Sequence, residues 1–500
     1  MKKKINTGTP SRNEKLFNLK IYLSLLFFLF FLRSYHSFFD LYVGEHTWTW
    51  LSVGKSLFNG NLPFIEIFTL RGPFTFVFYA FPFLFENYII ALKLLAIISI
   101  WISSIALFKI SKRLYGKKSA IFSSFGFLLI ISSEVSFLST EPELFIMPFL
   151  SFYIYFLFKD LVNPNRNSII LAGILISLAT LMRPNLGIIA FLGCFIYLLS
   201  EKKKFLNLIT YMASGFLPLL ITVILYSNVP DGLEILWNST IESSLAFTGK
   251  RPFFIGYFLF LEVFALKQWH PILIFAICMP FVNKELKKEL LILLFFMLIV
   301  IFSILLSRKF SSYNIMLIFP FISVIASSFF DKKNEFPKKI AIGFIIFCYL
   351  GPSINYLISQ ITLKYRPLNK TIVLSEYIKK IVKKDETIFS FDNGLYLLLN
   401  KKIPTKIAHP ASIFRYPLLR AYYGDPNYNT EMELTKIFDK NPDYIIMLEI
   451  WENSLPNSIK NKIRSDYTLV EFINEKEKNK LKKINRNYLN TTTLYKLINR

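Results

Sequence analysis

The chain of 500 residues is poor in the residues that stabilise or equip many soluble proteins. It holds 3 cysteines and 4 histidines, and only 18% of its residues are charged. Cys194, Cys278 and Cys348 lie far apart inside apolar segments, so the sequence predicts no disulfide framework and no zinc site. Hydrophobic residues make up 53% of the chain and aromatic residues 17%. This composition excludes an ordinary water-soluble globule.

Apolar runs of bilayer length recur from residue 21 to residue 360. Because each crossing needs roughly 20 apolar residues, the sequence predicts an α-helical polytopic membrane protein. The first run, from Ile21 to Leu32, precedes Arg33 instead of a small-residue cleavage site, so we interpret it as an uncleaved span. We expect about 11 transmembrane helices, centred near residues 30, 98, 127, 152, 175, 193, 216, 274, 298, 322 and 350.

The formal charge of +25 would suggest nucleic acid in a soluble protein. Here the cations fall in short breaks between apolar runs, as expected of cytoplasmic loops, and we predict no nucleic-acid partner. The most basic segments are the N-terminal tail and the breaks at 109–118, 159–166, 201–204, 283–289 and 331–339. All of these would face the cytoplasm. The breaks between them, including 39–73, 132–143 and 227–252, would face outward. An odd number of spans with the N-terminus inside places the C-terminus outside.

The composition changes at residue 364, where apolar runs shorten and charges mix. Residues 387–391, 443–448 and 467–473 have the pattern of short strands, while 371–384 and 431–440 are helix-like. We therefore predict two domains. Residues 1–363 form a transmembrane domain with a structured first outer loop at 39–73, and residues 364–500 form a small extracytoplasmic α/β domain.

Acidic residues gather in two outward segments. Glu45 precedes a predicted amphipathic helix at 46–58 that would lie at the membrane surface and end at Asn59–Gly60. Glu141 and Glu143 precede a later span. Each position has a structural interpretation as well, as a helix-start residue or a marker of the water boundary. If the two segments meet over one cavity, their carboxylates could serve acid–base or metal-assisted chemistry.

Cations on the same side complement these acids. Arg183, Arg308 and Lys309 end outward-going spans, and Lys93 lies near the outer end of the second span. Arginines at this depth are costly unless solvated or paired. Snorkelling to lipid headgroups is one interpretation, and binding of phosphate oxygens by the guanidinium fork is the other.

The spacing of Glu45, Gly60 and Leu62-Pro63-Phe64 resembles the first outer loop of the GT-C glycosyltransferases. Within that class the chain looks most like the protein mannosyltransferase and aminoarabinose transferase superfamily, the PMT-like enzymes of glycosyltransferase family 39. Further stretches resemble the family in the expected order at 66–73, 84–93, 140–142, 172–184, 308–320, 377–385 and 441–445. His46, Gly72 and Ser312 depart from the usual family residues.

The resemblance implies an enzyme of cell-envelope glycan synthesis that moves a sugar from a polyprenyl-phosphate donor to a lipid, glycan or protein acceptor. It implies a multi-pass protein of the bacterial cytoplasmic membrane, surrounded by membrane lipids. Glu45 would be the general base, and Glu141 would orient the acceptor or help to hold a divalent metal ion, the one cofactor that the resemblance allows. The residues expected at the donor phosphate are Arg183, Arg308, Lys309, Tyr313, Arg71 and Lys93, and those expected to position the acceptor or the loop are Glu66, His46 and Glu143.

A transporter or flippase of lipid-linked sugars is the alternative function. Transporters commonly show paired repeats and broken helices, and the sequence shows no internal repeat. A membrane scaffold would explain the spans but not the acids and cations on one side. Release of free carrier from a labelled donor distinguishes the enzyme from both.

Overall fold

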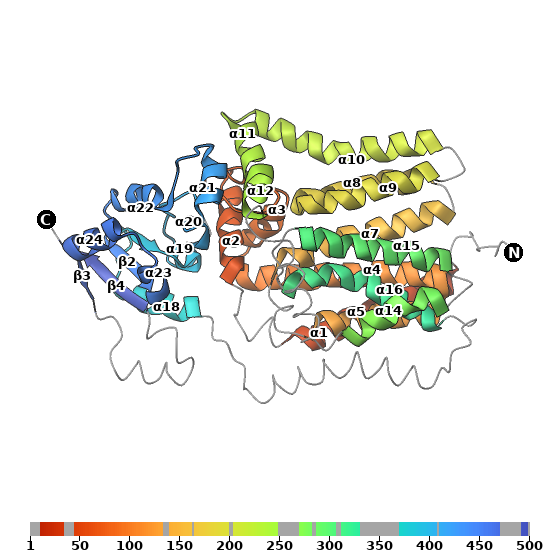
Figure 1. The fold of residues 1–500 in the computed structure, drawn as a ribbon. Helices are drawn as coiled ribbons and strands as arrows, with labels where there is room; N and C mark the ends of the chain where they lie inside the picture. Colours follow the sequence, from red (N-terminus) through yellow and green to blue (C-terminus); the bar gives the residue numbers. More distant parts are fainter. Residues whose placement is uncertain are drawn as a thin grey trace.

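A computed structural model gives the fold of the chain (Figure 1). It describes residues 11–34, 45–133, 140–162, 165–199, 204–248, 270–282, 287–306, 312–330, 370–407, 410–470 and 492–498. Long helices lie side by side in a bundle, and a smaller part with a β-sheet adjoins one end of it.

The bundle is built from apolar helices that run up and down through its length. They are α1 (Arg12–Ser34), α4 (Tyr88–Tyr115), α5 (Lys117–Ile131), α7 (Pro142–Val162), α8 (Arg166–Met182), α9 (Gly187–Leu199), α10 (Lys204–Ser227), α14 (His270–Val282), α15 (Lys287–Leu306) and α16 (Phe319–Ser327). Short turns η3 (Pro184–Leu186), η6 (Ser312–Ile318) and η7 (Ser328–Phe330) flank α9 and α16.

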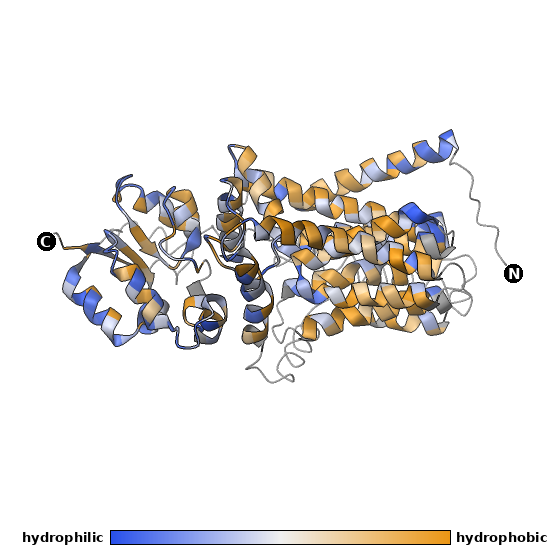
Figure 2. Cartoon of the chain, turned by 90° about the horizontal axis from the view of Figure 1, so that it is seen from above, coloured by the Kyte–Doolittle hydropathy of each residue, from blue (hydrophilic) through white to orange (hydrophobic). Residues whose placement is uncertain are grey.

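The expected span centres agree with these helices. Each centre from residue 30 to residue 322 lies inside a described helix, while the one near residue 350 lies outside the described residues. Five of the described helical segments are long and apolar enough to cross a membrane, namely Arg12–Arg33, Tyr88–Tyr115, Pro142–Lys159, Phe205–Ser227 and Tyr313–Phe330. Figure 2 shows apolar residues along the bundle and hydrophilic residues at its ends. The total of about 11 spans stays a prediction.

Local sequence signals set the ends of these helices. The Asn87 side chain accepts a hydrogen bond from the backbone of Ile90 and so begins α4, which ends at Gly116 with a φ of 97°. Asn165 caps α8 in the same way. Pro184 disfavours helical backbone at the residue before it, and α8 accordingly ends with Arg183 in an extended conformation.

The first outer loop forms its own layer at the end of the bundle. It holds α2 (Glu45–Phe58), α3 (Thr75–Ala80) and the turn η2 (Phe81–Leu84). As expected, α2 begins at Glu45 and stops before Gly60, whose φ is 97°. The structure differs from the expected surface helix in one respect, because polar as well as apolar residues of α2 are buried, including Thr47, Trp48, Thr49 and Ser52.

The C-terminal part holds a four-stranded sheet in the order β1-β2-β4-β3. Strand β1 (Ile388–Ser390) pairs in parallel with β2 (Tyr444–Leu448), and β4 (Thr492–Leu497) pairs antiparallel with both β2 and β3 (Tyr467–Leu469). The predicted strands at 387–391, 443–448 and 467–473 contain β1, β2 and β3, with 471–473 outside the described residues, whereas β4 was not predicted. The accompanying helices are α18 (Lys370–Ile378), α19 (Asn393–Leu398), α20 (Pro410–Ile413), α21 (Tyr416–Tyr423), α22 (Thr430–Phe438), α23 (Glu449–Asn453) and α24 (Asn457–Asp466).

The C-terminal part contacts the first outer loop directly. The Asn393 side chain donates to Thr49 Oγ1 over 3.1 Å, and Tyr422 donates to the backbone oxygen of Phe64 over 3.0 Å. Gly394 lies so close to Trp48 that an added Cβ would meet the indole ring at 2.8 Å. These contacts cover the second face of α2, which explains its burial.

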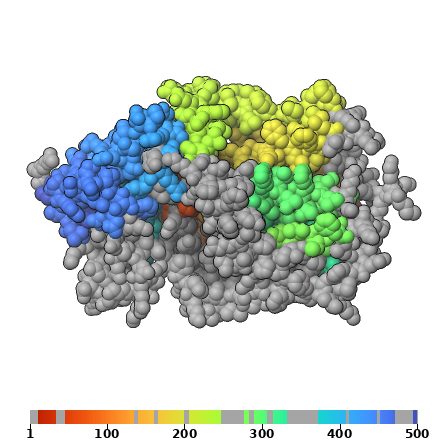
Figure 3. All heavy atoms as spheres, viewed as in Figure 1, coloured from red at the N-terminus to blue at the C-terminus, as the bar shows by residue number. Residues whose placement is uncertain are grey.

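A second contact involves the segment after α10. It comprises α11 (Gly232–Trp237), the π-helical turn η4 (Asn238–Glu242) and α12 (Ser243–Thr248), and it packs on α21. Figure 3 shows this yellow-green segment beside the light-blue part of the C-terminal region on the molecular surface.

Candidate functional site

Glu143 lies in the first turn of α7, at the end of the bundle that adjoins the C-terminal part. Pro142 begins this helix, and a carboxylate in a first turn is favoured by the helix dipole. The side chain of Glu143 is fully buried. A buried carboxylate is costly unless cations or donors surround it, so its partners decide its role.

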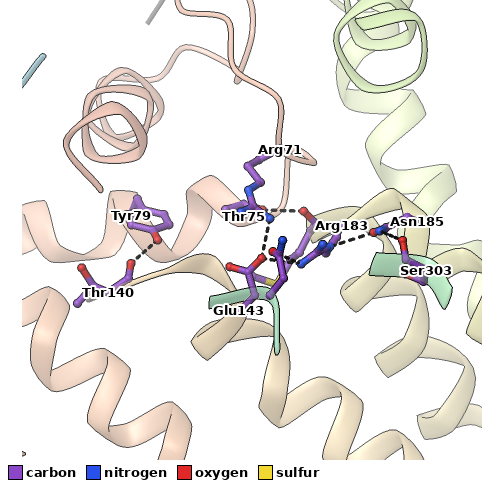
Figure 4. A network of polar contacts seen from close by, with 10 residues as sticks. Arg71, Thr75, Tyr79, Thr140, Glu143, Arg183, Asn185 and Ser303 are labelled. Atoms are coloured by element: carbon purple, nitrogen blue, oxygen red, sulfur yellow. Dashed lines mark hydrogen bonds and ion pairs between the residues drawn. The ribbon is translucent and has the colours of Figure 1, made fainter. Parts of the chain in front are cut away.

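Arg183 meets Glu143 from the end of α8 (Figure 4). Its Nη1 donates to Glu143 Oε1 over 2.6 Å and to Asn314 Oδ1, on η6, over 3.0 Å. The helix ends at Arg183 because of Pro184, and the extended backbone there brings the side chain to the neighbouring helix α7. Only 7% of Arg183 is exposed.

Arg71 reaches the same carboxylate from the first outer loop. Its Nη1 donates to Glu143 Oε1 over 3.0 Å. The adjacent Gly72 packs on the end of α8, where its N–H donates to the Met182 backbone oxygen over 3.1 Å. A Cβ at Gly72 would lie 1.9 Å from the Leu181 carbonyl oxygen, so this close approach requires glycine.

Polar groups near Arg71 and Arg183 link the first outer loop, the end of α8 and α15. Asn185 accepts from Arg183 Nε over 3.1 Å and donates to the Ser303 backbone oxygen, on α15, over 2.8 Å. Thr75 donates to the Met182 backbone oxygen over 3.0 Å. Asn185 and Asn314 were not predicted, although each is an amide within two positions of a residue that the sequence singled out, Arg183 or Tyr313.

Aromatic rings enclose Arg71. Its guanidinium carbon lies 5.5 Å from the Trp50 ring centroid and 6.0 Å from that of Tyr313. The His46 ring is 6.0 Å from Trp50 and 6.4 Å from Tyr313. These faces stabilise a cation, and they bring the predicted residues His46 and Tyr313 to the arginine cluster.

Glu141 is the second buried acid of this region, with 4% of its surface exposed. Tyr79 of α3 donates to the backbone oxygen of the preceding Thr140 over 2.6 Å, which ties this turn to the outer loop (Figure 4). Burial alone would lower the pKa of Arg71, but the carboxylate of Glu143, with Tyr313 and Glu141, outweighs it and holds the pKa above its ordinary value. Arg71 is therefore charged at every physiological pH.

Arg71, Arg183 and Glu143 together carry one positive charge, and the Glu141 carboxylate lies close enough to act on Arg71. Among the described contacts, none uses Nη2 of either arginine. Guanidinium N–H groups arranged in this way bind phosphate or carboxylate oxygens well. The described part of the chain holds no group of three or more His, Cys, Asp or Glu side chains that fits a metal ion.

Of the remaining predicted residues, the structure describes the side chains of two and not those of three. Glu66 is exposed and accepts a hydrogen bond from Ser56 over 2.8 Å, apart from the arginines. Lys93 is buried within α4. The side chain of Glu45 and the whole of Arg308 and Lys309 lie outside the described residues. Their roles stay predictions.

One family of known proteins matches part of the chain by sequence. A family model for dolichyl-phosphate-mannose-protein mannosyltransferases matches residues 73–226. That stretch contains Glu143 and Arg183 and begins two residues after Arg71. No curated protein matches the chain by sequence.

Solved structures share the fold over nearly the whole chain. ArnT from Cupriavidus metallidurans bound to undecaprenyl phosphate matches with a TM-score of 0.60 at 10% identity, covering 97% of this chain and 98% of that chain. Apo ArnT gives 0.56 at 12% identity, with 96% and 97% covered. The oligosaccharyltransferase AglB from Archaeoglobus fulgidus, with an inhibitory peptide and dolichol-phosphate, gives 0.50 at 13% identity, with 88% and 70% covered. The chain therefore shares the fold of these solved structures, and its residues 73–226 match the mannosyltransferase family model.

Proposed function

We propose that the protein is a membrane glycosyltransferase that transfers a sugar from a polyprenyl-phosphate donor to an acceptor outside the cytoplasm. The observation that carries this proposal is the convergence of Arg71 and Arg183 on Glu143 at one end of a GT-C bundle. The buried Arg183 and the partly buried Arg71 share one carboxylate, which leaves guanidinium N–H groups for the phosphate of a donor.

A lipid donor fits the position of the cluster. The arginines lie where the apolar helices end, so a phosphate bound there stands at the membrane boundary while its prenyl tail runs along the bundle. The solved ArnT structure holds undecaprenyl phosphate and the AglB structure holds dolichol-phosphate. These relatives support a polyprenyl phosphate as the donor class for this chain.

In the proposed reaction, Glu45 takes the proton from an acceptor hydroxyl as its oxygen attacks the anomeric carbon. The bond from that carbon to the phosphate oxygen breaks, and the carrier leaves as polyprenyl phosphate. Arg71 and Arg183 stabilise the negative charge on the leaving phosphate. Arg308, Lys309 and Tyr313 assist in this role, and Glu141 orients the acceptor.

The distribution of cations supports an outward-facing site. The helix ends furthest from Glu143 carry the basic breaks at 109–118 and 159–166, and the positive-inside rule places such breaks in the cytoplasm. Arg71, Glu143 and the C-terminal part then lie outside, and the N-terminus lies inside. A bacterial cytoplasmic membrane is the proposed location.

The function is tested by incubating the purified protein with a polyprenyl-phosphate sugar labelled in the sugar. The proposal predicts free polyprenyl phosphate and a labelled acceptor. Movement of intact donor between leaflets of a proteoliposome, without release of carrier, would instead establish the flippase and reject the enzyme.

The base is tested with Glu45→Gln, which keeps the side-chain size but cannot accept the proton. We expect transfer to fall at least 100-fold while membrane insertion and thermal unfolding stay unchanged. Glu86→Gln, at an exposed position before α4, is the matched control and should keep full activity. Near-normal turnover by Glu45→Gln rejects this assignment.

A further inference from the structure

A second group of cations lies at the opposite end of the bundle. Lys109 and Arg113 lie one turn apart on α4, and Lys159 lies near the end of α7. Arg113 Nη2 donates to the Lys159 backbone oxygen over 3.4 Å. Lys159 follows Glu143 by 16 residues on the same helix, which places the two about 24 Å apart along the axis.

The ammonium groups of this second group rest on aromatic rings of α7. Lys109 Nζ lies 5.6 Å from the Phe152 ring centroid and 5.7 Å from that of Tyr155. Lys159 Nζ lies 5.8 Å from the Phe156 centroid. All of these side chains are half-buried, so the three positive charges are held together in partly dehydrated surroundings.

Their charge is not balanced as it is at the other end. Arg71 and Arg183 share Glu143, whereas no ion pair joins Lys109, Arg113 or Lys159 to a carboxylate of the described residues, and Glu14 at this end pairs with Lys112 over 2.8 Å. The Nε of Arg113 is buried and has no hydrogen-bond partner in the described part of the chain. Grouped cations at a membrane boundary are stable when an anion joins them.

We propose that Lys109, Arg113 and Lys159 bind the phosphate of an anionic membrane lipid. The phosphate would accept hydrogen bonds from the two ammonium groups, the Arg113 guanidinium would add positive charge beside it, and the acyl chains of the lipid would lie beside Phe152 and Phe156. A free phosphate ion offers the same oxygens, but these neighbouring apolar rings favour a headgroup with an acyl chain. Basic pockets between helices on the cytoplasmic side bind anionic headgroups by this chemistry. The site is independent of the proposed transferase activity.

The test uses the full chain in phosphatidylcholine nanodiscs containing a trace of spin-labelled phosphatidylglycerol. The first variant carries Lys109→Gln, Arg113→Gln and Lys159→Gln. The matched control carries Lys117→Gln, Lys118→Gln and Arg166→Gln, which remove the same charge from exposed positions at the same end. The proposal predicts that the first variant binds labelled phosphatidylglycerol at least tenfold more weakly than the unchanged protein, and that the control loses less than threefold.

Equal losses in the two variants would overturn the proposal, because they would show general attraction of a basic surface. Unchanged binding by the first variant would also overturn it. Inorganic phosphate at constant ionic strength should not displace the labelled lipid; displacement would show that the site takes free phosphate instead. If the triple variant is not monodisperse, Lys109→Gln alone should weaken binding about threefold, and no loss in that variant would count against the site.

Discussion

Two buried glutamates of this chain, Glu143 and Glu433, have different kinds of partners. Glu143, at the end of the bundle, shares its Oε1 with Arg71 and Arg183, and its buried Oε2 has no hydrogen-bond partner in the described structure. Glu433, on α22 of the C-terminal part, accepts hydrogen bonds from the hydroxyls of Tyr423 over 2.9 Å and Tyr428 over 2.6 Å.

The two carboxylates differ in the charge of their partners and in whether both of their oxygens accept hydrogen bonds. Thr405 also donates to Glu433, and Lys436 donates to the Tyr428 hydroxyl over 2.9 Å. Burial and the nearby carboxylate raise the pKa values of Tyr423 and Tyr428, so both phenols stay protonated and donate. Both oxygens of Glu433 are therefore satisfied, as in a structural network. Glu143 instead leaves one oxygen and two guanidinium groups with unused capacity, as expected of a binding site.

The largest change in stability and in transfer activity is expected from Glu143→Gln. This change leaves the buried Arg183 and the partly buried Arg71 without their shared counter-charge, which should cost about 3 kcal/mol of stability and lower transfer at least 100-fold. Thermal unfolding and a transfer assay measure the two effects. Added undecaprenyl phosphate should restore more stability to this variant than to the unchanged protein, because its phosphate replaces the lost anion. A variant with normal stability and turnover would show that the cluster is not electrostatically coupled.

A smaller effect is expected from Gly72→Ala, which forces a Cβ against the Leu181 carbonyl oxygen. The loop must move and take Arg71 away from Glu143, so transfer should fall about tenfold because donor positioning is lost. The control is Gly187→Ala, where the nearest atom to an added Cβ is Thr180 Cγ2 at 3.4 Å, and activity should be kept. Equal activity of both variants would contradict the proposed contact of the loop with α8.

The smallest effect on activity is expected from Glu433→Gln. The amide oxygen still accepts from the tyrosines, so stability should fall by about 1 kcal/mol and turnover per folded molecule should stay within about twofold, since charge is not needed there. Thermal unfolding and the same transfer assay report both quantities. Should this variant lose as much activity as Glu143→Gln, the distinction between a structural and a binding carboxylate fails.

The bundle was the easier part to predict from the sequence, because long apolar runs form helices wherever a bilayer must be crossed. Strands β1, β2 and β3 were also predicted, since each is a short apolar run between polar residues. Strand β4 was missed because Thr492–Leu497 follows a lysine-rich stretch and mixes polar with apolar residues.

The site was predicted only in part. The sequence singled out Arg71, Glu143 and Arg183 separately, but it assigned Glu143 to the acceptor or the loop and did not pair it with the arginines. That pairing joins residues 72 and 40 positions apart in the chain, and it depends on how α7, α8 and the loop pack. The burial of α2 was missed for the same reason, since residues beyond 370 cover its second face.

The central claim is that Arg183 holds the phosphate of a lipid donor. Equilibrium binding of undecaprenyl phosphate to the purified protein tests it most directly, with Arg183→Gln compared with Arg166→Gln at the other end of the same helix. The account predicts at least tenfold weaker binding for Arg183→Gln, because a charged donor is lost, and unchanged binding for Arg166→Gln. Equal affinities for the two variants would contradict it.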